Sequence, residues 1–320
     1  MSLAQDIQNK AKQLGFDLVG ITDASTIDAA QAEHFDIWLK SGFAGQMESM
    51  HRNPDKRFNP ASLLEDAQSV IVAGLNFNPP EQQSNPTNPN EPTGRIAPYA
   101  RYEDYHTFIK IRLSELADYI TTVTEQDFRF KICVDSVPLA ERALAVRAGL
   151  GFIGRHHMLI NPKIGCQIFL GEIITTMKLE TDASIAPDCS NCHKCIDICP
   201  TGALKADGRF DTSRCINYLT IEHKGPLPPE LVTKIGDRLF GCNECILVCP
   251  YQKNAPVCGN KQFKFYSDRD AISLRKILDL SEESFEAEFS DSVIKRSGLD
   301  RLKRNARICL KNIKEESKAK

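Results

Sequence analysis

The stretch that decides the fold is CSNCHKCIDICP at residues 189–200, which CNECILVCP at 242–250 follows. The first stretch has the spacing CxxCxxCxxxCP. In this spacing three close thiolates bind one [4Fe–4S] cluster, and the fourth, beside proline, binds a second cluster. The spacing therefore predicts a ferredoxin-like domain with two clusters. Cluster one is expected to have four thiolate ligands, Cys189, Cys192, Cys195 and Cys249.

The second cysteine run is incomplete, because Leu239 stands where a regular run would begin. Cluster two is then one thiolate short, and Cys215, between the two runs, is the best candidate for the missing ligand. A zinc ribbon is the competing interpretation, since two CxxC pairs also fit zinc. A zinc site needs only four ligands, however, and does not require the CxxCxxCxxxCP spacing or a second Cys-Pro pair. The ligands expected for cluster two are Cys199, Cys215, Cys242 and Cys245.

Length and composition indicate an ordinary water-soluble protein. The 320 residues are 42% hydrophobic and carry a formal net charge of −2, enough for a large domain with a core plus a smaller one. The N-terminus has no basic start followed by an apolar segment, so we expect a cytoplasmic protein without membrane contact. That compartment keeps thiols reduced and favours metal ligation. Of the remaining cysteines, Cys133 and Cys166 lie in apolar runs and are predicted to be core residues.

The first half of the chain alternates between helical and strand patterns. Helices are predicted at 4–14, 105–123 and, opened by Pro138, 139–150; strands are predicted at 16–22, 69–77, 128–135, 157–162 and 166–177. Residues 79–98 are rich in proline and predict a surface loop. The fold class expected is α+β, with an α/β-like sheet domain, a bacterial-ferredoxin-like double [4Fe–4S] domain and a short C-terminal helical segment. The expected boundaries are 1–182, 183–258 and 259–320.

The last segment predicts an acidic helix near 279–291 and a basic one from Lys295 onward. Residues 295–320 hold ten Lys or Arg against three acidic residues. Such a run is either a solvated helix face or a patch that binds the phosphates of a nucleic acid. The candidate phosphate-binding side chains are Lys295, Arg296, Arg301, Lys303, Arg304 and Arg307.

Asp135, at the end of a predicted strand, is the candidate acid of the first domain. The alternative is that it caps the helix that Pro138 opens. The sequence has no GxGxxG after its first strand, no P-loop lysine and no HExxH, so neither a nicotinamide, nor ATP, nor a zinc-protease site is indicated.

Long motifs make the chain similar to the epoxyqueuosine reductases, the cobalamin-dependent iron–sulfur enzymes of queuosine synthesis in tRNA. They are HRNPDKRFNP at 51–60, RYEDYH at 101–106, VDSVPLAERALAVRAGLGFIGRHHMLINPKIG at 134–165, YLTIEHKG at 218–225 and the unequal cysteine runs. The resemblance implies an oxidoreductase that reduces epoxyqueuosine to queuosine in the anticodon loop. Electrons would pass through two [4Fe–4S] clusters to cobalamin. Asp135 matches the proton donor of that family, for which it must be protonated at some stage.

The cobalamin is expected in its base-off form without a histidine ligand. The DxHxxG pattern of proteins that bind the cobalt through a histidine is absent, because Asp104 and His106 are followed by Ile109 where the pattern needs glycine. Matching motifs imply that the corrin is walled by Arg57, Tyr99, Asp135, Met158, Leu170, Asn217, Cys242 and Asn243. The residues expected to face the tRNA are Glu222, His223, Lys224, Arg296, Arg301 and Arg304.

The partners that the resemblance implies are tRNA carrying epoxyqueuosine, with GUN anticodons, and a low-potential electron donor such as flavodoxin or ferredoxin. A monomer is expected. Two other functions stay open from the sequence. A plain electron carrier would bind the clusters but no corrin. A corrinoid-handling iron–sulfur reductase would bind both and would not need the basic C-terminal helix.

Overall fold

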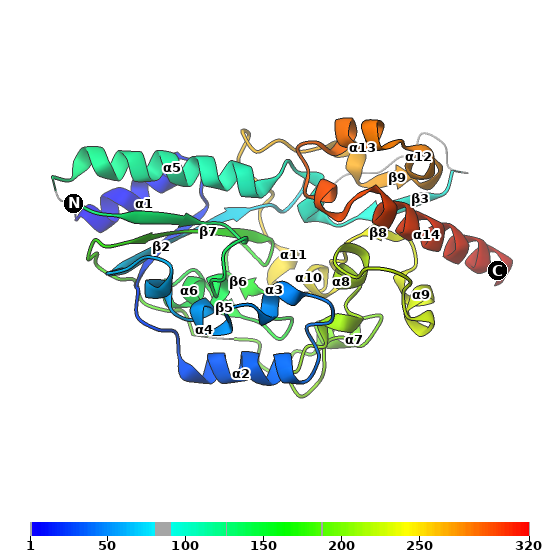
Figure 1. The fold of residues 1–320 in the computed structure, drawn as a ribbon, viewed down its shortest axis with the longest axis horizontal. Coiled ribbons are helices and arrows are strands. Elements are labelled where there is room, and N and C mark those ends of the chain that lie inside the picture. The colour runs from blue at the N-terminus through cyan, green and yellow to red at the C-terminus, as the bar shows by residue number, and fades with distance from the viewer. Residues whose placement is uncertain (1, 81–90, 126, 187, 320) are drawn as a thin grey trace.

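A computed structural model describes residues 2–80, 91–125, 127–186 and 188–319 (Figure 1). Its central feature is a four-stranded sheet in the order β1-β2-β7-β4, in which every neighbouring pair is antiparallel. The strands are β1 (Leu18–Asp23), β2 (Ser69–Asn76), β4 (Phe130–Cys133) and β7 (Ile168–Thr175). Strands β2 and β7 are buried along their whole length, so both read as nearly continuous apolar runs. The antiparallel order confirms the α+β class.

Helices cover both faces of this sheet. On one face lie α1 (Leu3–Gln13) and α5 (Tyr105–Val123), which contact each other as well as the strands. Helix α5 buries Ile109, Leu113, Leu116 and Ile120, which recur at helical spacing and form a core with β2 and β7. On the opposite face, α6 (Glu141–Arg147) covers β1, β2 and β7. The loop with Asp135 therefore leaves the sheet beside the start of α5 and runs toward α6.

The predicted helix that Pro138 was expected to open begins three residues later, at Glu141. Asp135 has a left-handed backbone, with φ of 53°, and the residues from Ser136 to Ala140 form an irregular loop. Ala140 is the N-cap and gives no side-chain hydrogen bond. The alternative that Asp135 caps this helix is therefore wrong, and its carboxylate is free for other contacts.

A second group of elements lies beside the four-stranded sheet (Figure 1) and packs around a core of its own. Its three-stranded sheet has the order β8-β3-β9, formed by β3 (Thr93–Ile96), β8 (Arg238–Phe240) and β9 (Ala271–Ser273). The helices around it are α8 (Ile216–Ile221), α9 (Pro229–Ile235), α12 (Leu274–Asp279), α13 (Glu282–Phe289) and α14 (Leu299–Ala319). This core joins side chains from all three expected segments, and the boundaries at 182 and 258 stay a prediction.

Strand β3 corrects the prediction of a loop over 79–98, of which residues 81–90 lie outside the described part. Thr93–Ile96 pairs in parallel with β8 and antiparallel with β9, both of which are distant in sequence. The local pattern of prolines cannot predict the pairing of β3 with β8 or with β9. The C-terminal helices are confirmed in kind, but a 3₁₀ turn over Val293–Ser297 separates α13 from the basic helix α14.

The cysteine region is compact and consists of short elements. It contains α7 (Lys194–Asp197), α10 (Glu244–Leu247) and α11 (Pro250–Lys253), with the hairpin β5 (Phe152–Ile153) and β6 (Leu159–Ile160) beside it. Outside the sheet lie α2 (Ala29–Lys40), α3 (Glu48–His51), α4 (Pro54–Arg57) and 3₁₀ turns at Pro60–Ser62, Pro98–Arg101, Thr212–Arg214 and Ser267–Arg269. Trp38 of α2 donates a hydrogen bond to the carbonyl of Phe210, which ties α2 to this region.

No helix in the described part of the chain is long and apolar enough to span a membrane.

Candidate iron–sulfur centre and active site

The cysteines expected to bind cluster one lie together beside the contact between α7 and α10. Burial raises the pKa of Cys195, and the nearby sulfur atoms of Cys189, Cys192 and Cys249 act in the same direction. Apolar side chains surround this group, with Phe152, Ile160 and Ile246 in one buried cluster with Cys249. Cys195 and Cys249 are buried, whereas Cys189 and Cys192 are half-buried. Four neighbouring thiols are the donor set of a [4Fe–4S] cluster.

The cysteines expected to bind cluster two are also neighbours. Burial raises the pKa of Cys215 to about 11, and the sulfur atoms of Cys242 and Cys199 add to this shift. Burial also raises the pKa of Cys245, with further contributions from Cys215, Cys242 and Cys199. Cys215 stands directly before α8, in the insert between the two runs. The structure brings its thiol close to the cysteines of the irregular second run, and its role as the fourth ligand stays a prediction.

Asp135 lies at a polar junction formed by the loop after β4 and the start of α5. Its Oδ2 accepts a hydrogen bond from the hydroxyl of Tyr105 at 3.2 Å and lies 3.1 Å from Nε2 of His106. The Asp135 side chain is 56% exposed, so it is open to a substrate. Its backbone N–H donates to Oε1 of Glu141 at 2.5 Å, which fixes the loop to the first turn of α6.

The hydrogen bond from His106 is the main cause that lowers the pKa of Asp135. This hydrogen bond favours the charged form of Asp135, and the role of Asp135 as an acid stays a prediction. Burial disfavours charge on His106, but hydrogen bonds to Asp104 and Asp135 outweigh it and raise the pKa. The carboxylate and imidazole form a pair that can hold one proton.

Arg296 gives His106 a second possible partner. The distance from Nη1 of Arg296 to Nε2 of His106 is 2.6 Å, and Nδ1 of His106 lies 2.6 Å from Oδ1 of Asp104. Asp104 accepts the Nδ1 proton, so Nε2 accepts from Arg296 when the ring is neutral and donates to Asp135 when it is protonated. Protonation of His106 thus selects which of two groups it binds.

Replacing His106 with glutamine should lower stability in a pH-dependent way. The raised pKa of His106 stabilises the fold below the ordinary value of 6.5 and loses this effect as pH rises through the folded value. The lowered pKa of Asp135 stabilises the fold above pH 3.8, and this stabilisation is lost as the pH falls through the folded value. At about pH 6 the loss should be about 1 kcal/mol, because solvent screens the exposed carboxylate. The Tm difference from the parent should shrink at about pH 9; an equal difference at both pH values would contradict this pair.

Two further carboxyl groups lie behind the junction, and the sequence analysis missed both. Burial and then the charge of Asp135 raise the pKa of Glu141 to about 7. Glu172 in β7 has no exposed surface, and burial raises its pKa well above the ordinary range, with the charge of Glu141 adding to the effect. A glutamate within the apolar run CQIFLGEIITT was the visible signal. Tyr105 and His106 lie in the motif RYEDYH at 101–106, but the sequence alone indicates no role for either side chain.

The residues expected to wall a corrin fall into two groups. Near Asp135, Arg57 feels the charges of Glu141 and Asp135 while burial lowers its pKa, and its Nε has no hydrogen-bond partner among the described residues. Met158 is 37% exposed although it is apolar. An unpartnered buried donor and an exposed apolar side chain fit a large, partly apolar ligand.

The second group lies beside the cysteines expected for cluster two. The hydroxyl of Tyr99 donates to Oδ1 of Asn217 at 3.1 Å, and burial raises the pKa of Tyr99, with the sulfur atom of Cys215 adding to the shift. Asn243 donates to Gln167 at 3.3 Å. Leu170 belongs to neither group, because it is buried in β7 in a core with Phe58 and Leu139.

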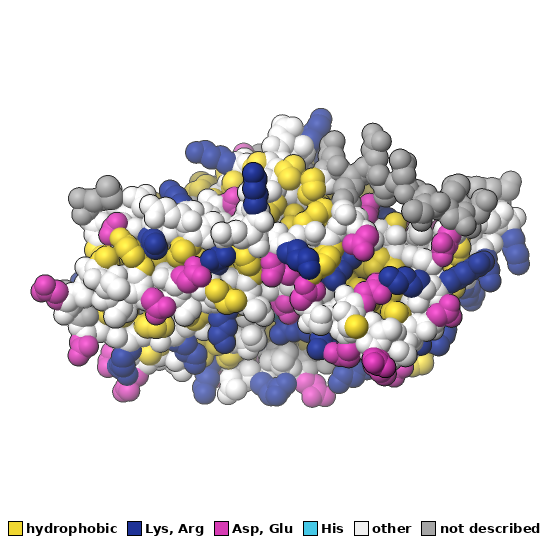
Figure 2. All heavy atoms as spheres, turned by 90° about the horizontal axis from the view of Figure 1, so that it is seen from above, with side chains coloured by type: hydrophobic (Ala, Val, Ile, Leu, Met, Phe, Trp, Pro, Cys, Tyr) yellow, Lys and Arg dark blue, Asp and Glu magenta, His cyan; other side chains and the backbone are white. Residues whose placement is uncertain are grey.

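The residues expected to face tRNA occupy different settings. Glu222 and Lys224 are exposed, whereas His223 lies 3.0 Å from the carbonyl of Pro226. Arg296 is at the Asp135 junction. Figure 2 shows basic side chains interspersed with acidic ones across the described part of one face, rather than gathered there in one continuous patch.

Arg304 is engaged within the protein. Its guanidinium donates to the carbonyls of Leu219 at 2.7 Å, His223 at 2.7 Å and Gly225 at 2.9 Å. These contacts satisfy the end of α8 and the loop after it. Burial, with the charge of Arg301 adding, lowers the pKa of Arg304 to about 10. The contacts favour a structural role for Arg304, while its tRNA contact stays a prediction.

Replacing Arg304 with alanine should destabilise the protein by about 2 to 3 kcal/mol, because three carbonyls lose a charged donor. The Tm should fall by about 5 °C. Arg307→Ala is the matched control, since Arg307 is exposed on the same helix and its removal should change stability by less than about 0.5 kcal/mol. Equal Tm values for the two variants would show that the Arg304 contacts do not support the fold.

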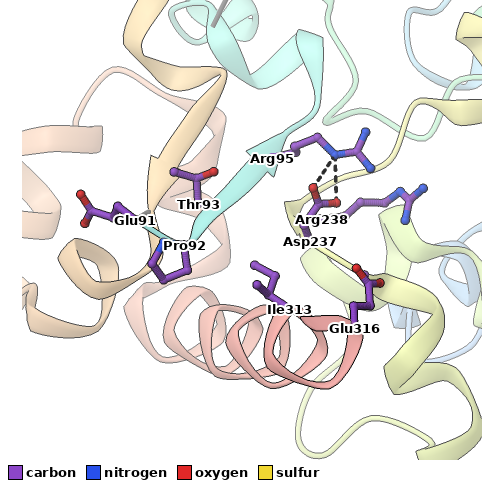
Figure 3. Close-up of a pocket in the computed structure, with 9 residues that line it drawn as sticks. Glu91, Pro92, Thr93, Arg95, Asp237, Arg238, Ile313 and Glu316 are labelled. Carbon is purple, nitrogen blue, oxygen red and sulfur yellow. Dashed lines mark hydrogen bonds and ion pairs between the residues drawn. The ribbon is translucent and has the colours of Figure 1, made fainter. Parts of the chain in front are cut away.

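A cavity of 440 Å³ lies away from these groups, between β3, β8 and α14 (Figure 3). Its wall includes the ion pair of Arg95 with Asp237, at 2.9 Å. None of the residues expected at the active site lines it. A second cavity of 280 Å³ includes His223 and Gln46 in its wall.

Comparison with known proteins gives the same picture. The family described as "Epoxyqueuosine reductase QueG, DUF1730" matches residues 57–136, and the one described as "4Fe-4S double cluster binding domain" matches residues 188–252. The chain is 36% identical to the epoxyqueuosine reductase of Pseudomonas aeruginosa over 97% of this chain and 85% of the relative. It is 35% identical to that of Escherichia coli, over 97% and 81%.

Solved structures agree at the level of the whole chain. An epoxyqueuosine reductase with an epoxyqueuosine-modified tRNA-Tyr stem loop matches with a TM-score of 0.91 and 31% identity, over 98% of this chain and 82% of that one. A Bacillus subtilis epoxyqueuosine reductase, described with its catalytic aspartate loop swung out of the active site, also has a TM-score of 0.91, with 31% identity and the same coverages. Fold, thiols and matches define an iron–sulfur oxidoreductase with a double [4Fe–4S] domain. The chain belongs to the epoxyqueuosine reductase family.

Proposed function

We propose that this chain reduces epoxyqueuosine to queuosine in the anticodon loop of tRNA, with cobalamin bound between the Asp135 junction and the cluster-two cysteines. The observation that carries the proposal is the placement of these parts. An exposed carboxylate with a proton-holding histidine lies in the sheet domain, and two four-thiol groups lie in the cysteine region. Each part has a necessary role in a reductive removal of oxygen.

The residues fit a corrin by their chemistry. Arg57 offers an unpartnered buried donor, and Met158 an exposed apolar surface. Leu170, Tyr99, Asn217 and the backbone at Cys242 and Asn243 would complete the wall. When bound, cobalamin supplies a low-potential reductant for the epoxide carbon. The cobalamin is proposed to bind in its base-off form, without a histidine ligand to the cobalt.

The electrons would enter from a low-potential donor such as flavodoxin or ferredoxin. Cluster one and cluster two would relay them one at a time. Cluster two is the proposed exit, because its cysteine Cys215 lies close enough to Tyr99 to act on the pKa of that phenol. The insert that supplies Cys215 also starts α8, which carries Asn217.

The overall reaction consumes two electrons and two protons. Both carbon–oxygen bonds of the epoxide break, an alkene forms, and the oxygen leaves as water. Asp135 would donate a proton to the departing oxygen, and His106 would return one to Asp135. Tyr105 orients the carboxylate through its 3.2 Å hydrogen bond, and Glu141 holds the Asp135 backbone.

The substrate would be tRNA with a GUN anticodon, bound across the loop after α8 and the basic helix α14. Glu222, His223, Lys224, Arg296, Arg301 and Arg304 stay the proposed contact residues. Because Arg304 holds the fold, Arg301 and Arg307 are the better pair for charge reversal. If tRNA turnover by that double variant kept its speed and salt dependence, the phosphate patch would be wrong. The protein is proposed to act as a cytoplasmic monomer.

The competing function is a corrinoid-handling iron–sulfur reductase or an electron carrier. The two are separated by incubating anaerobic protein, with clusters and cobalamin, with an epoxyqueuosine-containing stem loop and a low-potential reductant. Conversion of the nucleoside supports the proposal. Reduced corrinoid without any conversion would support the competing function.

A further inference from the structure

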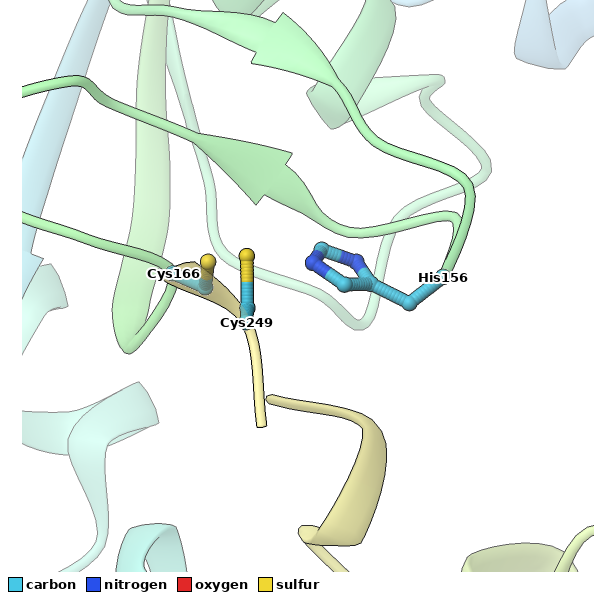
Figure 4. A group of neighbouring side chains, drawn as sticks. All are labelled: His156, Cys166 and Cys249. Carbon is cyan, nitrogen blue, oxygen red and sulfur yellow. The ribbon is translucent and has the colours of Figure 1, made fainter. Parts of the chain in front are cut away.

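A buried histidine and a buried cysteine lie against one of the proposed ligands of cluster one. The candidate ligand atoms of His156, Cys166 and Cys249 lie within 4.8 Å of one another, and all three residues are buried (Figure 4). Cys249 is the remote ligand of cluster one in the proposed assignment. Cys166 lies outside both cysteine runs and follows the β5–β6 hairpin, so neither run explains why it is here.

The fold holds Cys166 in this place. Its backbone N–H donates to Oε1 of Gln252 at 2.8 Å, and Gln252 belongs to α11, directly after Cys249. Gly165 has φ of 87°, and a Cβ there would lie 2.7 Å from both Gln252 Oε1 and the Cβ of Ala255. The backbone before Cys166 therefore approaches α11 as closely as only glycine permits. The thiol is directed to this site by two independent constraints.

A backbone hydrogen bond fixes the proton on the ring of His156. The N–H of Met158 donates to Nδ1 of His156 at 3.2 Å, so the neutral imidazole carries its hydrogen on Nε2. Nε2 is buried and has no hydrogen-bond partner among the described residues. Leaving such a donor unsatisfied costs about 1 to 3 kcal/mol. Figure 4 shows the edge of the imidazole turned toward the two sulfur atoms.

We propose that His156 and Cys166 are positioning residues of cluster one, which donate N–H and S–H hydrogen bonds to the thiolate of Cys249. This inference rests on the proposed cluster assignment. A hydrogen bond to a ligand sulfur stabilises the more negative, reduced cluster more than the oxidised one, and so raises its reduction potential. Cluster one would thus be tuned separately from cluster two.

The first test is a redox titration of the anaerobic holoprotein, followed by the electron paramagnetic resonance of its clusters. His156→Phe and Cys166→Ala should each move one midpoint to a more negative value and leave the other in place. We expect at least a tenfold change in the ratio of reduced to oxidised cluster, which is about 59 mV for one electron. Cys166→Ser keeps a donor and should shift less, and Cys258→Ala is the control for a cysteine outside the site. Two unmoved midpoints in His156→Phe would overturn the proposal.

A second measurement uses the unchanged sequence, so that no variant needs to fold. Protein labelled with ¹⁵N in histidine should show a nitrogen hyperfine coupling to a reduced cluster, and an exchangeable proton should couple as well. Absence of the nitrogen coupling in protein with full iron content would overturn the role of His156. Iron content also tests the underlying assignment separately, because Cys249→Ala should lose cluster one; retention of both clusters there would refute the ligand set instead.

Discussion

Replacement of Asp135 by asparagine is expected to slow the conversion of epoxyqueuosine by about 10² to 10⁴-fold, the usual contribution of a general acid. Asparagine keeps the size of the side chain and can still accept from Tyr105, but it has no acidic proton. The side chain is 56% exposed, and it is not the cap of α6. The protein should therefore still fold and keep both clusters. The rate is measured by quenching the reaction and quantifying the two nucleosides.

Asp36→Asn is the control for this prediction, because Asp36 forms an exposed ion pair with Lys40 on α2. It should keep the full rate. Iron content should match the parent in both variants. The Tm should match the parent in Asp36→Asn, whereas Asp135→Asn should lose only the contribution of about 1 kcal/mol from the pair with His106. If Asp135→Asn kept its rate within about threefold, the proton would have to come from another group, and His106 would be the first candidate.

Replacement of Cys215 by alanine is expected to remove cluster two and to abolish turnover. Iron should fall from about eight to about four atoms per chain, because a [4Fe–4S] cluster held by three thiolates is exposed to loss. Cys215 is the proposed replacement for the cysteine that the second run lacks at Leu239. The structure places its thiol near those of Cys242 and Cys199. Iron and sulfide analysis of anaerobic protein gives the result directly.

Cys258→Ala is the matched control, since Cys258 is partly buried but belongs to neither ligand set. It should retain about eight iron atoms. Full iron content in Cys215→Ala would contradict the assignment and require another fourth ligand. Loss of all iron would instead mean that the two clusters do not assemble independently.

The parts that the sequence predicted well are those set by local patterns. The apolar residues of Tyr105–Val123 recur at helical spacing, and α5 has those bounds. The cysteine spacings predicted a double-cluster domain because ligand geometry restricts how far apart thiolates can be in the chain. The α+β class followed from strands and helices that local periodicity already separates.

Other features depend on contacts between distant residues. Strand β3 was predicted as loop because its stability comes from β8 and β9, not from the prolines around it. The junction at Asp135 brings His106 and Arg296 together across 190 positions of sequence, which no local pattern indicates. The sequence predicts Arg304 only as one of the phosphate-binding side chains of the basic C-terminal helix. Only the fold shows that the carbonyls after α8 occupy its donors.

The most direct test of the central claim is the mass of the modified nucleoside after reaction. Anaerobic protein with both clusters is incubated with epoxyqueuosine-containing tRNA and a low-potential reductant, with and without cobalamin, and the tRNA is digested for mass spectrometry. We predict the loss of one oxygen atom only where cobalamin is present. An unchanged nucleoside, from protein with full iron content and bound corrin, would contradict the account.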